Sequence, residues 1–366
     1  MTFNDVLEIK NGRNQKAVEN PDGRYPIYGS GGIIGHSDDY ICEAGTVIVG
    51  RKGSINNPIF VGEPFWNVDT AFGLTAKKDV LLPRYLYYFC MHFDFERLNK
   101  AVTIPSLTKS DLLKIEILLP DLNEQQNVVD KLQEVERIML LHQEAITKLD
   151  EIIKARFVEM FGDPVSNPKG WPMPPIEDVV SPEKNALKAG PFGSALKKEY
   201  YVESGYKIYG QEQVISGDSN YGDYYIDEER YKQLENCAVQ AGDVLISLVG
   251  TYGKLLIMPD CFEPGIINPR LMKITFDKSK VNPYYFQHYF QSDSLKRSLA
   301  DNTHGGTMDI LNLGIVRKLK MPLPPIELQN KFVDFVVQAD KSKSVVQKSL
   351  DKMQLLFDSL MQQYFG

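Results

Sequence analysis

Apolar residues recur at steps of three and four in two long stretches of the chain, from Pro120 to Gly162 and from Pro324 to Gly366. This spacing places the apolar side chains on one face of a helix. Each stretch predicts a helix of about 38 residues and about 57 Å, given a rise of about 1.5 Å per residue. Seven apolar positions match at a constant separation of 204 residues: Ile146, Leu149, Ile152, Ile153, Phe157, Met160 and Phe161 match Leu350, Met353, Leu356, Phe357, Met361, Tyr364 and Phe365.

Both predicted helices begin after a proline and end at a glycine, residues that favour a helix start and a helix stop. The two stretches have the same length, which indicates that their register matters. A helix of this length is too long to be covered by one small domain, so an ordinary core helix is the weaker interpretation. We expect the two helices to pack together as a coiled-coil-like pair.

The regions that precede the helices also resemble each other, so the chain consists of two copies of one module. The matching segments are 25–29 and 206–210, 44–48 and 241–245, 83–86 and 283–286, and 120–125 and 324–329. Their separation grows from 181 to 204 residues and then stays constant. The second globular copy is therefore longer than the first by insertions, which surface loops tolerate.

Short β-rich runs alternate with glycine-rich turns in both globular regions. Buried strands are expected at 46–49 and 244–247, turns at 29–32 and 250–253, and short aromatic helices at 85–89 and 285–289. The segment 162–172 is rich in Pro, Gly and Asn and predicts a sharp exit from the first helix. The expected fold is α+β with strongly curved sheets. Its parts are a domain at 1–119, a helix at 120–162, a domain at 163–323 and a helix at 324–366.

Composition indicates a protein of the cytoplasm with two sizeable cores. The chain has 366 residues, 43% of them hydrophobic, and a net charge of −7. No run approaches the roughly 20 apolar residues that span a membrane, and no signal peptide is recognisable. The four cysteines form no CxxC pair, which favours reduced thiols over a metal site. Neither globular region is basic in bulk, so a DNA surface would have to be a local basic patch or would have to borrow charge from a partner.

The chain shows no reactive constellation. Gly50–Ser54 has the residue types of a phosphate-binding loop without the spacing, and neither GxSxG nor HExxH occurs. Asn57–Phe60 and Asn268–Leu271 come near the Asn-Pro-Pro-aromatic motif of amino-methyltransferases but lack its second proline. The five histidines are scattered. We therefore expect a non-catalytic protein without a metal or cofactor of its own.

The ordered set of motifs resembles the specificity subunit of type I DNA restriction-modification enzymes. The resemblance rests on the domain–helix alternation and on Ile104–Leu107, Pro120–Gln125, Phe161–Trp171 and Ala241–Leu245. It covers essentially the whole chain. One departure is that the first domain lacks a counterpart of the segment around Trp171, so its first strand is expected to be short.

The resemblance implies two target-recognition domains and an antiparallel helix pair with approximate twofold symmetry. Each domain would read one half of an asymmetric, bipartite site in double-stranded DNA, and the helices would set the gap. It also implies two modification subunits that bind S-adenosylmethionine and methylate adenine. Restriction subunits, which use ATP, can join such complexes. No membrane is involved.

Base readout needs hydrogen-bonding side chains on loops, and phosphate contacts need basic and hydroxyl groups. Equivalent loops that differ within a shared frame are the best candidates. In the first copy these are Ser30, Arg51, Lys52, Ser54, Asn67, Thr70, Ser106 and Lys109; in the second they are Gln211, Gln213, Thr251, Tyr252, Lys254, Asn268, Arg270, His304 and Thr307. For each single residue, an ordinary turn or a solvated side chain is the alternative.

A second function stays open at this point. The helices could serve oligomerisation in a scaffold whose two domains bind a protein or another ligand. The difference between equivalent loops favours DNA recognition, whereas the acidic balance favours the scaffold.

Overall fold

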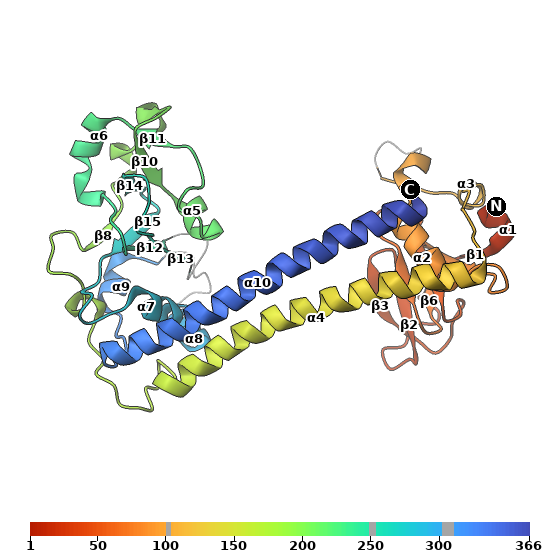
Figure 1. Cartoon of the computed structure of the whole chain (residues 1–366), viewed down its shortest axis with the longest axis horizontal. Helices are drawn as coiled ribbons and strands as arrows, with labels where there is room; N and C mark the ends of the chain where they lie inside the picture. The colour runs from red at the N-terminus through yellow and green to blue at the C-terminus, as the bar shows by residue number, and fades with distance from the viewer. Residues whose placement is uncertain (100–103, 249–253, 302–310) are drawn as a thin grey trace. The chain divides into compact units, whose positions relative to one another are not determined.

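The computed structural model describes residues 1–99, 104–248, 254–301 and 311–366 (Figure 1). The chain forms two compact units, unit 1 with residues 1–145 and 345–366 and unit 2 with residues 146–344. Each unit therefore holds one globular region, the start of the helix that follows it, and the end of the other long helix. The boundaries predicted from the sequence separate each domain from its helix, whereas each compact unit contains parts of both long helices. The predicted domain boundaries therefore stay predictions.

Unit 1 contains two sheets with several short helices. The first sheet is antiparallel, with the strand order β1-β7-β4-β5, and the second has the order β3-β2-β6. The elements are α1 (Phe3–Val6), β1 (Leu7–Asn11), β2 (Tyr25–Gly29), β3 (Gly32–Ser37), β4 (Thr46–Gly50), β5 (Ile59–Val61), β6 (Trp66–Asn67), β7 (Ala71–Ala76), α2 (Pro83–His92), η1 (Phe95–Leu98), α3 (Lys109–Leu112) and the long α4 (Leu122–Phe161).

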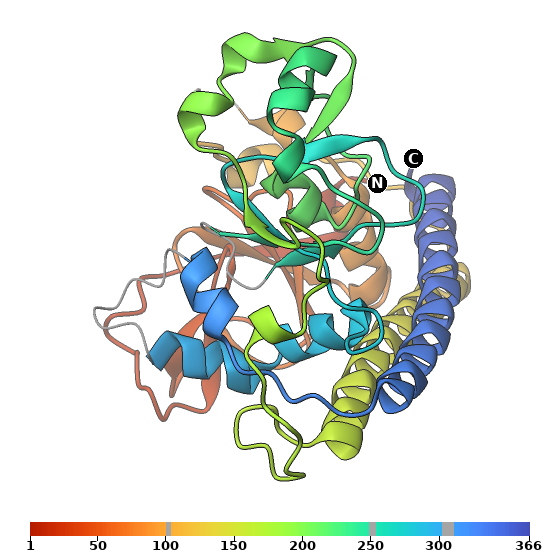
Figure 2. The same ribbon diagram turned by 90° about the vertical axis from the view of Figure 1, so that its left-hand side faces the viewer.

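Unit 2 repeats this plan with insertions. Its sheets have the orders β13-β12-β15-β8 and β14-β10-β11-β9. The elements are η2 (Ile176–Asp178), β8 (Leu187–Ala189), η3 (Gly193–Ala195), η4 (Lys198–Tyr200), β9 (Tyr201–Val202), β10 (Tyr206–Tyr209), α5 (Gln211–Ser216), β11 (Tyr225–Ile226), α6 (Glu228–Gln233), η5 (Glu235–Cys237), β12 (Val244–Ser247), β13 (Leu255–Ile257), β14 (Gly265–Ile267), β15 (Leu271–Ile274), α7 (Pro283–Phe290), α8 (Asp293–Asp301), α9 (Leu313–Lys318) and the long α10 (Ile326–Phe365). In Figure 2 the second sheet (green) lies at the end of the unit away from α7 and α8 (blue).

The predicted helices and strands are largely confirmed. Both long helices have 40 residues, and the aromatic helices α2 and α7 and the strands β4 and β12 lie where the pattern places them. The expectation of a short first strand is wrong, because β1 has five residues and β8 has three. The predicted turn at 250–253 lies outside the described residues.

Within each unit, the start of one long helix packs beside the end of the other, so the pairing is antiparallel. In unit 1, Leu132 of α4 shares a core with Phe357 of α10. In unit 2, the rings of Phe157 and Phe332 pack at 5.4 Å. The apolar stripe is not buried throughout, because Ile152 is 50% exposed while the neighbouring Ile153 lies in the core of unit 2.

Each long helix is fixed at its start by a buried glutamine. Gln125 accepts a hydrogen bond from Leu82 N at 2.8 Å and donates to the carbonyls of Val80 and Pro120, both at 2.9 Å. Gln329 makes the same three contacts in unit 2, with Asn282 N, Lys280 O and Pro324 O. These contacts explain why glutamine stands at both positions of the repeated Pro…Gln motif.

Candidate nucleic-acid interface

In unit 1, several predicted residues meet where β4 ends and β7 begins. Arg51 N donates to the carbonyl of Thr70 at 2.8 Å, and the exposed guanidinium donates to the carbonyl of Asp69 at 3.4 Å. Lys52 N donates to the same Thr70 carbonyl at 3.2 Å, and Lys52 pairs with Ser106 in an isolated β-bridge. The backbone is therefore fixed while the basic side chains point into solvent.

The other candidates of unit 1 lie around this edge or away from it. Ser30 and Ser54 both lie against Gly50, the last residue of β4. Lys109 is engaged elsewhere, since its ammonium donates to the carbonyl of Ile9 at 2.6 Å. That contact leaves the charge exposed but fixes the side chain along β1.

Asn67 is a correction to the predicted readers. Its side chain is fully buried, and Nδ2 donates to the carbonyl of Ala71 at 3.1 Å. The amide therefore shapes the turn between β6 and β7 and cannot reach a base.

In unit 2, the corresponding edge brings Gln211, Ser247 and Arg270 together. Gln211 Nε2 donates to the hydroxyl of Ser247 at 2.8 Å, and Arg270 Nη1 donates to Gln211 Oε1 at 3.3 Å. Asn268 Oδ1 accepts from Arg270 N at 2.9 Å and holds this turn. Ser247 is not among the residues predicted from the sequence. It is the last residue of β12, and its counterpart in the first copy is Gly50, the last residue of β4.

The backbone frame of this edge is the same in both units. Leu248 N donates to the carbonyl of Arg270 at 2.9 Å, as Arg51 N does to that of Thr70. The exposed Lys254 lies beside Ser247, whose N–H donates to the Lys254 carbonyl at 3.3 Å. The remaining candidates lie outside the described residues: Thr251, Tyr252, His304 and Thr307.

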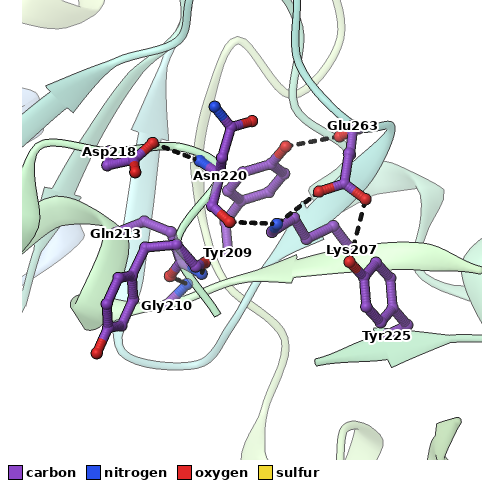
Figure 3. Close-up of polar contacts among 9 residues, drawn as sticks. Lys207, Tyr209, Gly210, Gln213, Asp218, Asn220, Tyr225 and Glu263 are labelled. Carbon is purple, nitrogen blue, oxygen red and sulfur yellow. Dashed lines mark hydrogen bonds and ion pairs between the residues drawn. The ribbon is translucent and has the colours of Figure 1, made fainter. Parts of the chain in front are cut away.

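Gln213 is the second correction. Its side chain is 1% exposed, accepts a hydrogen bond from Gly210 N at 2.7 Å and donates to the carbonyl of Tyr221 at 2.5 Å. It therefore caps α5 and holds the following loop. Figure 3 shows Gln213 beside Gly210, the residue before α5. Gln211 remains the only one of the two glutamines with a side chain at the surface.

A buried lysine supports the same loop. Figure 3 shows Lys207, from β10, reaching both Glu263 Oε1 at 2.5 Å and the carbonyl of Asn220 at 3.0 Å. Tyr225 donates to the other oxygen of Glu263 at 3.1 Å. The hydrogen bond from Lys207 holds the pKa of the Glu263 carboxyl below its usual value. This arrangement orders the segment inserted in the second copy, where the first copy has Pro26 in place of Lys207.

The described parts of the chain offer no metal site, because no group of three or more His, Cys, Asp or Glu side chains converges there. All four cysteines are free thiols, and burial raises the pKa of Cys42 to about 11. None of the described helices is both long enough and apolar enough to cross a membrane.

Comparison with known proteins agrees with this architecture. Residues 1–151 and 169–353 match the type I restriction modification DNA specificity domain. The MjaVIII specificity subunit of Methanocaldococcus jannaschii is 20% identical over 330 residues, which cover 85% of this chain and 73% of the relative. The EcoBI specificity subunit of Escherichia coli is 20% identical over 350 residues, covering 87% and 72%.

Solved structures share the fold. The type I restriction-modification S subunit of M. genitalium has a TM-score of 0.59 at 17% identity and covers 100% of this chain and 95% of its own. A chain from a structural study of type I complex assembly and conformational transition gives 0.64 at 16%, covering 100% and 96%. Because the family match extends over both halves of the sequence, the chain belongs to the specificity subunits of type I DNA restriction-modification enzymes.

Proposed function

We propose that this non-catalytic chain reads a bipartite, asymmetric site in double-stranded DNA, one half with each globular region. The observation that carries the proposal is the contrast between the two equivalent edges. On one backbone frame, unit 1 presents Ser30 and Thr70 where unit 2 presents Gln211 and Arg270. A shared frame with changed side chains is what two readers of different sequences require.

The side chains of unit 2 suit direct base readout. Arginine bonds guanine and glutamine bonds adenine with two hydrogen bonds, each pair contributing about 1–3 kcal/mol of discrimination. Gln211 and Arg270 already contact each other, so DNA would find them partly ordered. Unit 1 offers the exposed Arg51 and Lys52 together with hydroxyl groups, which suit phosphate and mixed contacts.

The long helices are proposed to dock two modification subunits. Equivalent apolar side chains are exposed on both, Leu141 with Val345 and Ile152 with Leu356. Repeated exposed apolar positions are typical of protein-binding surfaces. The modification subunits would hold S-adenosylmethionine and methylate adenine, and restriction subunits would use ATP. An approximate twofold relation between the copies would then present the two readers to opposite strands.

The test is to purify the chain with an adenine modification subunit and to map methylated adenines across a genome. We expect one interrupted motif. Arg270→Ala should relax one half of it, with discrimination reduced about tenfold to a hundredfold. Arg297→Ala removes an exposed guanidinium from α8 of the same unit and is the matched control. Failure to co-purify, or an unchanged motif in Arg270→Ala, would contradict the proposal.

The helix pair can be tested as a ruler in the same complex. Seven residues inserted after Ala145 and after the equivalent Ser349 would add about 10 Å to both helices at about 1.5 Å per residue. The gap should grow by about three base pairs, given about 3.4 Å per base pair. An unchanged gap in the methylation motif would show that the helices do not set it.

A further inference from the structure

The loop that follows the first strand of each copy, β1 in unit 1 and β8 in unit 2, is basic. Residues 9–18 contain Lys10, Arg13 and Lys16 and no acidic residue. Residues 186–198, around β8, contain three lysines and no acidic residue. In a chain with a net charge of −7, these loops are local segments of the sign that attracts a phosphate backbone.

The two loops leave the sheet in the same way. Gly12 N donates to the carbonyl of Ala71 at 3.3 Å, and Gly190 N donates to that of Leu271 at 2.9 Å. A Cβ atom at Gly12 would overlap the carbonyl of Val68, and one at Gly190 would overlap that of Asn268. Glycine is therefore required at both positions, because the backbone of each loop lies against the turn that carries Thr70 or Arg270.

The side chains two residues beyond these glycines differ. Asn14 stands in the first copy and Phe192 in the second, and both are exposed. Asn14 Oδ1 accepts a hydrogen bond from Lys16 N at 2.9 Å, which orients the amide. The two loops thus carry different side chains at equivalent backbone positions, as Ser30 and Gln211 do.

Phe192 is held in solvent by an ordered backbone. Its side chain is 89% exposed, whereas Leu196 four residues later is buried in the core of the unit. Between them, Ala195 N donates to the carbonyl of Phe192 at 2.8 Å and closes a short turn. A phenyl ring kept in water forgoes the favourable free energy of burial, so the ring gains by contact with an apolar or aromatic surface.

We propose that these two loops, residues 12–16 and 190–198, contact DNA at equivalent places of the two half-sites. Asn14 reads a base edge, since asparagine bonds adenine with two hydrogen bonds. Phe192 stacks on a base or inserts at a base step, which apolar side chains do in bent or unstacked DNA. The inference rests on the proposed DNA-reading function and assigns to it a loop with a different mode of recognition in each copy.

DNA fits this surface better than a protein partner does. The loops 12–16 and 190–198 contain basic and no acidic residues, although Lys197 pairs with the following Glu199 at 3.4 Å. They also adjoin the polar edge residues and recur in both copies at the same backbone position. Aromatic stacking accepts any base. Phe192 would therefore contribute affinity and sensitivity to the deformability of a base step, and not specificity for one base.

The experiment uses the complex with its modification subunits and a duplex that carries the methylation motif of the wild type. 2-Aminopurine is placed in turn at each position of the half-site read by unit 2, except at the methylated adenine. We expect a rise in fluorescence at one position with the wild type and with Phe192→Tyr. Phe192→Ala should lose that rise and methylate the site about tenfold more slowly or worse.

Asn14→Ala is the reciprocal variant. It should leave the 2-aminopurine signal unchanged and relax one base of the other half-site in the methylation map. Both substituted side chains are exposed, so unfolding curves should match the wild type and exclude misfolding. Phe192→Ala with wild-type fluorescence, rate and motif would overturn the inference while leaving the bipartite reading intact. A wild-type complex that methylates no interrupted motif would refute the proposed function and this inference together.

Discussion

The starts of the two long helices and the edges of the two sheets have diverged to different degrees. Gln125 and Gln329 keep the same three hydrogen bonds, whereas the residue after the Tyr-Gly pair is Ser30 in one copy and Gln211 in the other. The helix starts must satisfy buried backbone groups, which leaves little freedom. The edges face solvent, so their side chains can change without loss of the backbone hydrogen bonds that form each edge.

The largest effect is expected from removing a helix anchor. Gln125→Leu would leave one N–H and two carbonyls, all partly buried, without the partner that Gln125 provides. Each unsatisfied group costs about 1–3 kcal/mol, so the free energy of unfolding of unit 1 should fall by about 4 kcal/mol. Chemical denaturation followed by circular dichroism would measure this loss.

The neighbouring Gln126 provides the control for that variant. It is exposed and contacts only Asp130 among the hydrogen bonds described for it, so Gln126→Leu should change stability little. Gln329→Leu should reproduce the large loss in unit 2. Equal effects of Gln125→Leu and Gln126→Leu would mean that the buried contacts are not what fixes the helix.

A pH-dependent difference is expected between equivalent positions behind the helix starts. Tyr88 donates to Glu136 at 2.6 Å, whereas unit 2 has His288 near Asp340. Burial lowers the pKa of His288 to about 4 from 6.5, with Asp340 opposing and Lys343 reinforcing the shift. The folded state therefore binds fewer protons than the unfolded state between these values, and stability is lost as the pH falls from 6.5 to 4.

We expect unit 2 to lose about 2 kcal/mol over that range, less than the full shift implies because solvent reaches part of the ring. His288→Tyr, which copies the residue of unit 1, should flatten the dependence. Urea unfolding at pH 6.5, 5.5 and 4.5 would measure it. An equal slope in the variant and the wild type would assign the loss to other groups.

The smallest effect concerns the inserted segment of the second copy. Lys207→Met should leave Asn220 O without its donor and Glu263 without its ion pair, and destabilise unit 2 by about 1–2 kcal/mol. The loss stays moderate because Glu263 remains partly solvated. Lys232→Met breaks an exposed pair with Glu228 and should have no measurable effect. Loss of the half-site preference in Lys207→Met alone would show that the ion pair positions the reader.

The positions of the helices were predictable from the sequence, but whether a given polar side chain is exposed enough to contact DNA was not. The apolar spacing and the Pro and Gly limits placed α4 and α10 to within two residues, because helix periodicity is a local property. Asn67 and Gln213 were misjudged because buried and base-reading amides have the same chemistry, and only tertiary contacts separate them. The loop after Gly12, which we propose contacts DNA, does not stand out in the sequence because the copies share only its glycine.

The exchange of helix ends has a consequence for the order of synthesis. The core of unit 1 includes Phe357 and Met361, which the ribosome adds more than two hundred residues after Leu132. At about 5–20 residues per second, the first domain waits about 10–45 s with an uncovered apolar face. During that interval the apolar face is exposed, so aggregation competes with folding until the end of α10 is made.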